Sequence, residues 1–217
     1  MKTLLELFQK YNNYENVDYP SDKNSYHSYI EDVYEEYFST YRNEKINLLE
    51  IGVAHSGSIR LWNDYFKNAQ IYGIDNFSCG EEIKNKSEDL IDGKLKNVKI
   101  ICDDAYAENI SDKLPDFDII IDDGPHTLNT QLRCIEFYLP LLKPNGIMFI
   151  EDIVVDFEYD YEGDELSQHP TINSLIQKIP DEKYEYKIFD LRKNVIGRPG
   201  IPEEGRGDNV ILAIKVI

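Results

Sequence analysis

The stretch "LLEIGVAHSGSIRLW", residues 48–62, has the pattern of a buried strand followed by a glycine turn and a helix. Its apolar run ends at Gly52, and apolar side chains return at helical spacing over residues 58–66. Gly52 permits a tight turn, and Gly57 permits a ligand to approach the backbone closely. The stretch therefore predicts the first strand–turn–helix unit of an α/β domain.

The alternation of strands and helices continues along the chain. Helical spacing is clearest over residues 58–66 and 128–142, and Pro140 should shorten the second helix near its end. Strands separated by helices form a mostly parallel sheet that is covered on both faces. The last two strands lack a helix between them, which favours an antiparallel pair. We therefore expect an α/β fold with a Rossmann-like, doubly wound, mostly parallel seven-stranded sheet and an antiparallel last strand, built from residues 46–52, 70–75, 98–102, 117–122, 146–152, 184–191 and 209–216.

The segment before the first strand is rich in tyrosine and is expected to be helical. A short amphipathic start over residues 4–8 precedes a polar stretch, and Ser25 has the position of a helix N-cap. Apolar side chains then follow at helical spacing from Tyr26 to Phe38. We expect a single domain over residues 1–217, with a helical N-terminal extension over 1–45 and a Rossmann-like core over 46–217.

The composition narrows the class of protein and of partner. The chain has 217 residues, 41% of them hydrophobic, and a formal net charge of -18. This charge argues against nucleic acid as a partner, because binding to it requires a basic face. The sequence has no long apolar run and no charged-then-apolar leader, so we expect no membrane contact and a cytoplasmic location. The scattered cysteines, Cys79, Cys102 and Cys134, favour reduced core thiols. A homo-oligomer that uses the tyrosine-rich N-terminal helix stays open.

Acidic residues follow five of the expected strands. In open α/β sheets, ligands bind at the carboxyl ends of the strands. One or two acids there are ordinary turn chemistry, whereas five in the same place predict a binding site. The acidic positions are Glu50, Asp75, Asp103–Asp104, Asp122–Asp123 and Glu151–Asp152.

The glycine loop after the first strand is a candidate cofactor site. It lacks the GxGxxG fingerprint, so a nicotinamide-dinucleotide enzyme is disfavoured. The helix N-terminus that follows the loop would attract a negative group, and Asp75 is placed to accept hydrogen bonds from ribose hydroxyls. An ordinary glycine turn and an ordinary strand-end aspartate explain the same residues equally well.

"LLEIGVAHSGSIRLW" together with "IYGIDNF" (71–77) resembles motifs I and II of class I S-adenosylmethionine-dependent methyltransferases. In that family the glycine loop holds the methionine part of the cofactor and the second acid holds the ribose. "CDDAY" (102–106) resembles the next motif, in which an acid contacts the adenine, although Cys102 replaces a residue that is usually small. The resemblance implies cofactor contacts from Glu50, Gly52, Ser56, Gly57, Asp75 and either Asp103 or Asp104.

Two acid pairs suggest a metal site. Neighbouring strands lie about 4.8 Å apart, so Asp122–Asp123 and Glu151–Asp152 should come close together. Their mutual repulsion is relieved by a hard divalent cation such as Mg²⁺, which prefers oxygen ligands. Solvated turn acids, with His126 capping the next helix, are the plainer alternative. Zinc is disfavoured by the single local histidine, and a glycosidase-like acid pair finds no matching scaffold.

"IDDGPH" (121–126) followed by "IEDI" (150–153) resembles the metal-dependent methyltransferase branch that includes macrolide-sugar and rhamnosyl O-methyltransferases and cephalosporin hydroxylase. The resemblance implies that Asp123, Glu151 and Asp152 hold Mg²⁺ and that His126 is the general base. Asp122 is expected to face the cofactor or to brace the turn. Pro125 replaces the usual serine, so any hydroxyl contact at that position is lost.

The N-terminal stretch "SDKNSYHSYIEDVYEEYF" (21–38) also resembles that branch, which often has a DK…HxY element before its sheet. Lys23, His27 and Tyr29 match this element, and the resemblance implies that they close over the cofactor or the substrate. A polar residue near a helix start is the alternative interpretation of His27.

The acceptor side is less defined. The acidic stretch after Asp152 is either a solvated surface or a mobile lid over the metal. Residues 191–209 gather four cations among glycines and prolines, and we hypothesise that Arg198 and Arg206 hold an anionic part of the acceptor, such as a diphosphate. A flexible surface hairpin is the alternative.

The sequence thus favours an S-adenosylmethionine- and Mg²⁺-dependent O-methyltransferase that acts on a sugar hydroxyl of a nucleotide sugar or glycoside, with His126 as base. A methyltransferase for a catechol-like or other natural-product hydroxyl is the main rival. A non-catalytic cofactor-binding partner protein is the rival from another class, and the intact metal acids and His126 argue against it.

Overall fold

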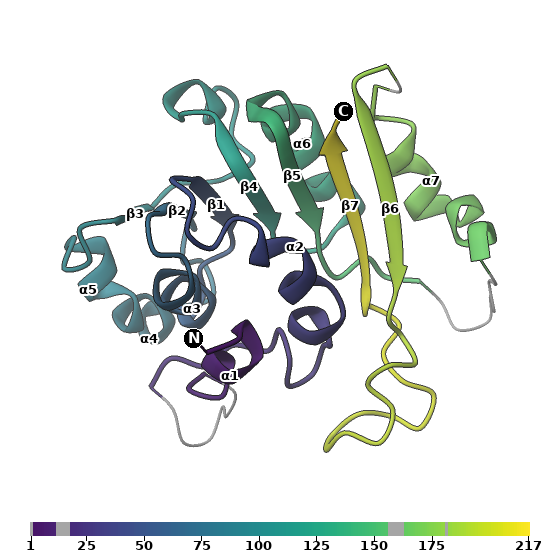
Figure 1. The fold of residues 1–217 in the computed structure, drawn as a ribbon, viewed down its shortest axis with the longest axis horizontal. Helices are drawn as coiled ribbons and strands as arrows, with labels where there is room; N and C mark the ends of the chain where they lie inside the picture. The colour runs from purple at the N-terminus through teal and green to yellow at the C-terminus, as the bar shows by residue number, and fades with distance from the viewer. Residues whose placement is uncertain (1, 12–17, 156–162, 181) are drawn as a thin grey trace. The chain divides into compact units, whose positions relative to one another are not determined.

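A computed structural model describes residues 2–11, 18–155, 163–180 and 182–217 (Figure 1). Its sheet has seven strands in the order β3-β2-β1-β4-β5-β7-β6. All seven expected strands are present, and the α/β prediction with an antiparallel last strand is confirmed. The strands are β1 (Asn47–Ile51), β2 (Gln70–Ile74), β3 (Val98–Ile101), β4 (Phe117–Asp122), β5 (Leu142–Ile150), β6 (Tyr184–Asp190) and β7 (Val210–Val216).

The chain divides into two compact units, of which the first ends at Ala105. In this unit β1, β2 and β3 run parallel, with Glu50 opposite Gly73 and Gly73 opposite Ile100. Buried apolar side chains on all three strands form its core together with Trp62 and Phe38. Its helices are α1 (Leu4–Phe8), the π-helix η1 (Ile30–Tyr34), α2 (Glu35–Ser39), α3 (Gly57–Tyr65), α4 (Glu81–Lys86) and α5 (Glu88–Ile91).

The N-terminal extension is helical, but the start predicted for its main helix is wrong. The N–H groups of Ser25, Tyr26 and His27 all bond the carbonyl oxygen of Asp22, which makes a tight turn there. The helix begins with η1 at Ile30, so Ser25 is not its N-cap; the Ser25 hydroxyl instead faces the Ser21 carbonyl at 3.4 Å. The earlier helix α1 lies where the sequence predicts, with a capping box between Thr3 and Glu6.

The second unit begins at Tyr106. Strands β4 and β5 are parallel, and β7 is antiparallel to both β5 and β6. Helix α6 (Leu128–Tyr138) is capped by Thr127 and gives way to the 3₁₀ turn η3 (Leu139–Leu141) around Pro140, as the sequence predicts. The unit also contains η2 (Ser111–Lys113), η4 (Gly163–Gln168) and α7 (Pro170–Ile176).

Two further sequence expectations can be compared with the described residues. None of the described helices has the length and apolarity that a bilayer crossing requires. The three cysteines are unbridged, but only Cys134 is a core thiol, since Cys79 and Cys102 are exposed. The expectation that all three are core residues is therefore wrong, because Cys79 and Cys102 lie beyond strand ends, where side chains reach solvent. The division into a single domain stays a prediction.

Candidate active site

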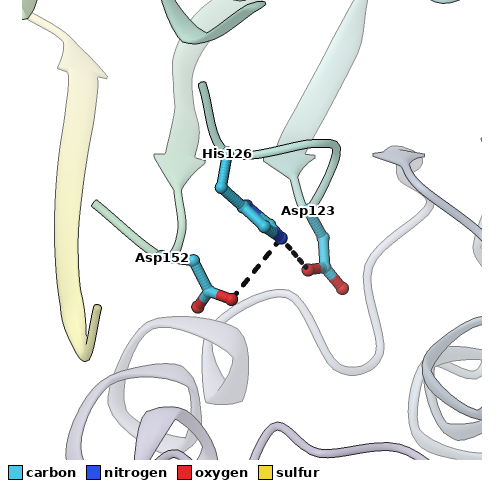
Figure 2. Close-up of side chains that lie close together, drawn as sticks. All are labelled: Asp123, His126 and Asp152. Carbon is cyan, nitrogen blue, oxygen red and sulfur yellow. Dashed lines mark ion pairs between the residues drawn. The ribbon is translucent and has the colours of Figure 1, made fainter. Parts of the chain in front are cut away.

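Three side chains at the ends of β4 and β5 form a cluster with metal-binding character: Asp123, His126 and Asp152 (Figure 2). The Nε2 atom of His126 lies 3.7 Å from Oδ1 of Asp123 and 3.5 Å from Oδ2 of Asp152. One ligand atom from each residue lies within 4.8 Å of the others. The cluster is half-buried, so an ion could reach it from solvent while the side chains stay held by the fold.

The parallel pairing of β4 and β5 positions this cluster. Asp122 is opposite Ile150, and the Glu151 N–H continues the ladder to the Asp122 carbonyl at 3.0 Å. Asp123 and Asp152 therefore leave neighbouring strands at the same edge. His126 and Asp152 both have left-handed backbones, with φ of 55° and 53°. Such a conformation costs a non-glycine residue about 1–2 kcal/mol, and strain of this kind is concentrated at functional sites.

The cluster fits a divalent cation, and it includes two of the three predicted Mg²⁺ ligands. The carboxylates of Asp123 and Asp152 are the hard oxygen ligands that Mg²⁺ prefers. Glu151 is outside this cluster within the described part of the chain; it is 1% exposed, and its carbonyl accepts a hydrogen bond from Nε2 of Gln131 at 3.0 Å. Its role as a ligand stays a prediction, as does the role of His126 as base.

Asp122 braces the turn before the cluster. Its side chain is 2% exposed, and Oδ1 accepts a hydrogen bond from the Tyr106 hydroxyl at 2.9 Å. Burial raises the pKa of Asp122 to about 6, an effect that the Tyr106 hydrogen bond and the nearby His126 partly offset. The observed contact matches the bracing alternative, while a cofactor contact stays a prediction. Sequence reasoning did not single out Tyr106, and its place in "CDDAY" was the only signal.

Asp75 holds the glycine loop in the first unit. Its Oδ2 atom accepts the backbone N–H groups of Val53 at 2.8 Å and Ala54 at 2.9 Å, and its Oδ1 accepts the Phe77 N–H at 2.6 Å. The loop has positive φ at Gly52 (87°), Ala54 (42°) and Ser56 (62°). Successive N–H groups in such a turn form a nest for an anion, and here the Asp75 carboxylate lies in it. Its expected ribose contact stays a prediction.

Other predicted cofactor residues are buried in the same unit. Glu50 is fully buried, accepts a hydrogen bond from Nε1 of Trp62 at 3.0 Å and lies 3.3 Å from Nζ of Lys23. Ser56 is also fully buried. A Cβ atom on Gly57 would lie 2.2 Å from the Pro20 carbonyl oxygen, so the group that approaches this glycine closely is the chain's own backbone. Cofactor contacts from these three residues stay predictions.

The remaining expectations in this unit concern the adenine acids and the N-terminal element. Asp103 and Asp104 are exposed, and the Asp104 N–H bonds Oδ1 of Asp103 at 2.9 Å. His27 and Tyr29 are 2% and 1% exposed, and their rings stack at 4.6 Å. Both pack inside the unit, and substrate contact from them stays a prediction.

The cation-rich stretch over residues 191–209 is tied by ion pairs. Arg206 forms a two-pronged pair with Asp208, at 2.9 and 2.6 Å, and the buried Arg192 pairs with Asp190 at 2.7 Å. The N–H groups of Ile153 and Val155 bond carbonyls of Val210 and Gly207, which fixes the chain just after Asp152. Acceptor contacts from Arg198 and Arg206 stay predictions. The acidic stretch over residues 156–162 lies outside the described residues.

The strand order, the loop after β1 and the acids at the strand ends give this chain the fold of class I S-adenosylmethionine-dependent methyltransferases, and residues 49–153 match the family model of a methyltransferase domain, Methyltransf_24. The resemblance to their macrolide-sugar branch is confirmed by two relatives. The chain is 27% identical over 195 residues to the 8-demethyl-8-alpha-L-rhamnosyl tetracenomycin-C 2'-O-methyltransferase of Streptomyces olivaceus, which covers 85% of this chain and 47% of that protein. It is 33% identical over 129 residues to the mycinamicin VI 2''-O-methyltransferase of Micromonospora griseorubida, over 55% of this chain and 30% of that protein.

A solved structure shows the same resemblance to this branch of methyltransferases. The MycE methyltransferase of mycinamycin biosynthesis, determined in complex with Mg and SAH, matches 70% of this chain and 37% of its own with a TM-score of 0.56 and 26% identity. The chain thus spans less than half the length of these relatives.

Proposed function

We propose that this protein is an S-adenosylmethionine- and Mg²⁺-dependent O-methyltransferase that acts on a sugar hydroxyl. The observation that carries the proposal is the cluster of Asp123, His126 and Asp152, because it combines two hard ligands with an imidazole base at the carboxyl ends of two parallel strands. The relatives support the sugar hydroxyl as acceptor, since one of them is named as the O-methyltransferase of a rhamnosyl compound.

The chemistry is an in-line displacement. The acceptor oxygen forms a bond to the methyl carbon of S-adenosylmethionine as the bond from that carbon to sulfur breaks, and sulfur leaves as a neutral thioether. The hydroxyl proton goes to Nε2 of His126, because an imidazole is the side chain that most often acts as a general base. Mg²⁺, held by Asp123, Asp152 and Glu151, would lower the pKa of a nearby hydroxyl and orient it.

The cofactor side of the proposal uses the first unit. The glycine loop over residues 52–57 holds the methionine part, Asp75 accepts hydrogen bonds from the ribose hydroxyls, and Asp103 or Asp104 contacts the adenine. Asp75 can serve the loop and the ribose together, because each carboxylate oxygen has more than one lone-pair site.

The acceptor is proposed to be a glycoside or a nucleotide sugar. A nucleotide sugar would require cations for its diphosphate, and Arg198 and Arg206 are the candidates. Kinetics with both acceptor types separate the two: Arg198→Gln should raise the KM of a nucleotide sugar and leave that of an uncharged glycoside unchanged.

The central experiment is a titration with S-adenosylmethionine, followed by a screen of glycosides and nucleotide sugars with labelled cofactor, with and without EDTA. His126→Ala should keep cofactor and metal binding and lose turnover. If His126→Ala turns over at the wild-type rate, His126 is not the base. If S-adenosylmethionine does not bind, the proposed function as a whole is wrong.

A further inference from the structure

Tyr106 is fixed beneath the turn that carries the metal cluster. This turn, residues 122–127, joins β4 to α6 and provides Asp123 and His126. The Tyr106 hydroxyl donates to Oδ1 of Asp122, the first residue of the turn, at 2.9 Å. The Tyr106 carbonyl accepts a hydrogen bond from Nη1 of Arg133, on the helix after the turn, at 2.7 Å. Tyr106 is thus held by the structural elements on both sides of the turn.

Gly124 shows how closely the turn fits over this hydroxyl. A Cβ atom on Gly124 would lie 2.0 Å from the Tyr106 hydroxyl oxygen and 3.2 Å from Oδ1 of Asp122. The backbone of Gly124 has no left-handed φ, so a side chain is excluded there by space and not by conformation. The next residue, Pro125, has a fixed φ and limits the freedom of the turn further.

We infer that Tyr106 is a positioning residue for the metal site: its hydroxyl sets the path of residues 122–127 and thereby the places of Asp123 and His126. Asp122 transmits the effect. Its carboxylate is buried, and Oδ1 has the tyrosine hydroxyl as donor. Without the hydroxyl, the buried carboxylate of Asp122 would lose a hydrogen bond, which favours its rotation toward solvent or toward the cluster. The backbone of residues 122–127 would then shift with it. The inference rests on the proposed function, because it takes Asp123 and His126 as parts of a metal site.

The test is Mn²⁺ binding, by electron paramagnetic resonance and calorimetry, to the full chain carrying Tyr106→Phe. Loss of an outer partner of a metal site typically weakens metal affinity about 10- to 100-fold, and we expect a change in this range. Tyr184→Phe is the matched control, since its buried hydroxyl donates to the Leu139 carbonyl at 3.3 Å in the same unit. Urea unfolding without metal is measured for both variants, because a merely structural tyrosine would lower stability and leave the Kd for Mn²⁺ unchanged.

Gly124→Ala provides a second route to the same turn. Alone, it should weaken Mn²⁺ binding by displacing the Tyr106 hydroxyl. In the Tyr106→Phe background it should add little, because the oxygen that it meets at 2.0 Å is gone. Wild-type Mn²⁺ affinity in either single variant overturns the inference. The inference is also overturned if the losses of Mn²⁺ affinity in the two single variants add fully in the double variant. If the wild-type chain itself binds no Mn²⁺, the proposed metal site is wrong, which is a separate and recognisable outcome.

Discussion

Lys23 and Glu50 form an ion pair in which both side chains are almost entirely buried, at 1% and 0% exposure and 3.3 Å between Nζ and Oε1. The lysine comes from the N-terminal extension, and the glutamate is the residue of β1 that precedes the glycine loop by two positions. Replacement of Lys23 by Met keeps the length and the apolar stem of the side chain and removes its charge. We expect this change to destabilise the first unit severely.

The size of the effect follows from the distance and the burial. At 3.3 Å and an effective dielectric constant of roughly 20, the attraction between the two charges is about 5 kcal/mol. In the native protein this attraction offsets the several kcal/mol that burial of each ion costs. Lys23→Met removes the attraction and leaves the Glu50 charge buried, so the free energy of unfolding should fall by about 3–5 kcal/mol.

Urea unfolding of the single variants and of Lys23→Met/Glu50→Gln measures this as a double-mutant cycle. The glutamine keeps an acceptor for the Trp62 N–H, and the double variant should be more stable than Lys23→Met alone because no buried charge remains. Lys215→Met is the control: its pair with Glu185 spans 3.7 Å with side chains 47% and 59% exposed, and should be worth less than about 1 kcal/mol. A loss as small as that for Lys23→Met, or full additivity in the cycle, would refute the reasoning.

Three further outcomes are expected. Asp75→Ala removes the acceptor from two N–H groups of the glycine loop, at about 1.5–3 kcal/mol for each hydrogen bond to a charged group. If this loop binds the cofactor as proposed, the change should weaken S-adenosylmethionine binding at least tenfold in calorimetry. Asp75→Asn keeps an acceptor and should bind the cofactor more tightly than Asp75→Ala. Burial and then Lys86 lower the pKa of His55 from 6.5, against the opposing effects of Glu82 and Asp22. The unfolded chain therefore binds this proton first, and the contribution of His55 to stability should fall as pH drops below 6.5. Urea unfolding should show this as a stability difference between wild type and His55→Gln that changes in this direction between neutral and mildly acidic pH. EDTA should abolish turnover and added Mg²⁺ should restore it, whereas turnover that EDTA leaves unchanged would contradict the metal requirement.

The strands and their ends could be predicted from the sequence because each is a local signal. The apolar runs are short, β-branched and bounded by glycine, proline or acids, as at 117–122, where three isoleucines precede Asp122. The parallel order then places the ends of consecutive strands at one edge. From this geometry the sequence predicts that Asp123 and Asp152 lie close together, and they do so in the structure.

Two contacts that the sequence did not indicate join residues far apart in the chain. Lys23 and Glu50 are 27 positions apart in the chain, and Tyr106 and Asp122 are 16 positions apart, and no periodic signal pairs them. The resemblance implies that Glu151 is also a metal ligand; Glu151 is buried in the structure, and its role stays a prediction. The sequence did not predict that the helix starts at Ile30. The N–H groups of residues 25–27 bond the Asp22 carbonyl in a local turn, so these residues are not the first turn of the helix.

The backbone around Asp152 shows how the fold holds this proposed ligand in place without an ion. Its left-handed φ of 53° is unfavourable for an aspartate, so the residue would relax if its neighbours were free to move. They are not: the Glu151 N–H is bonded to the Asp122 carbonyl, and the Ile153 N–H to the Val210 carbonyl, at 3.0 and 3.1 Å. The sheet therefore holds the residues on both sides of Asp152, and the favourable pairing of two strands offsets the strain at one residue between them. Because the conformation is imposed by the fold, the free energy of metal binding need not be used to create it.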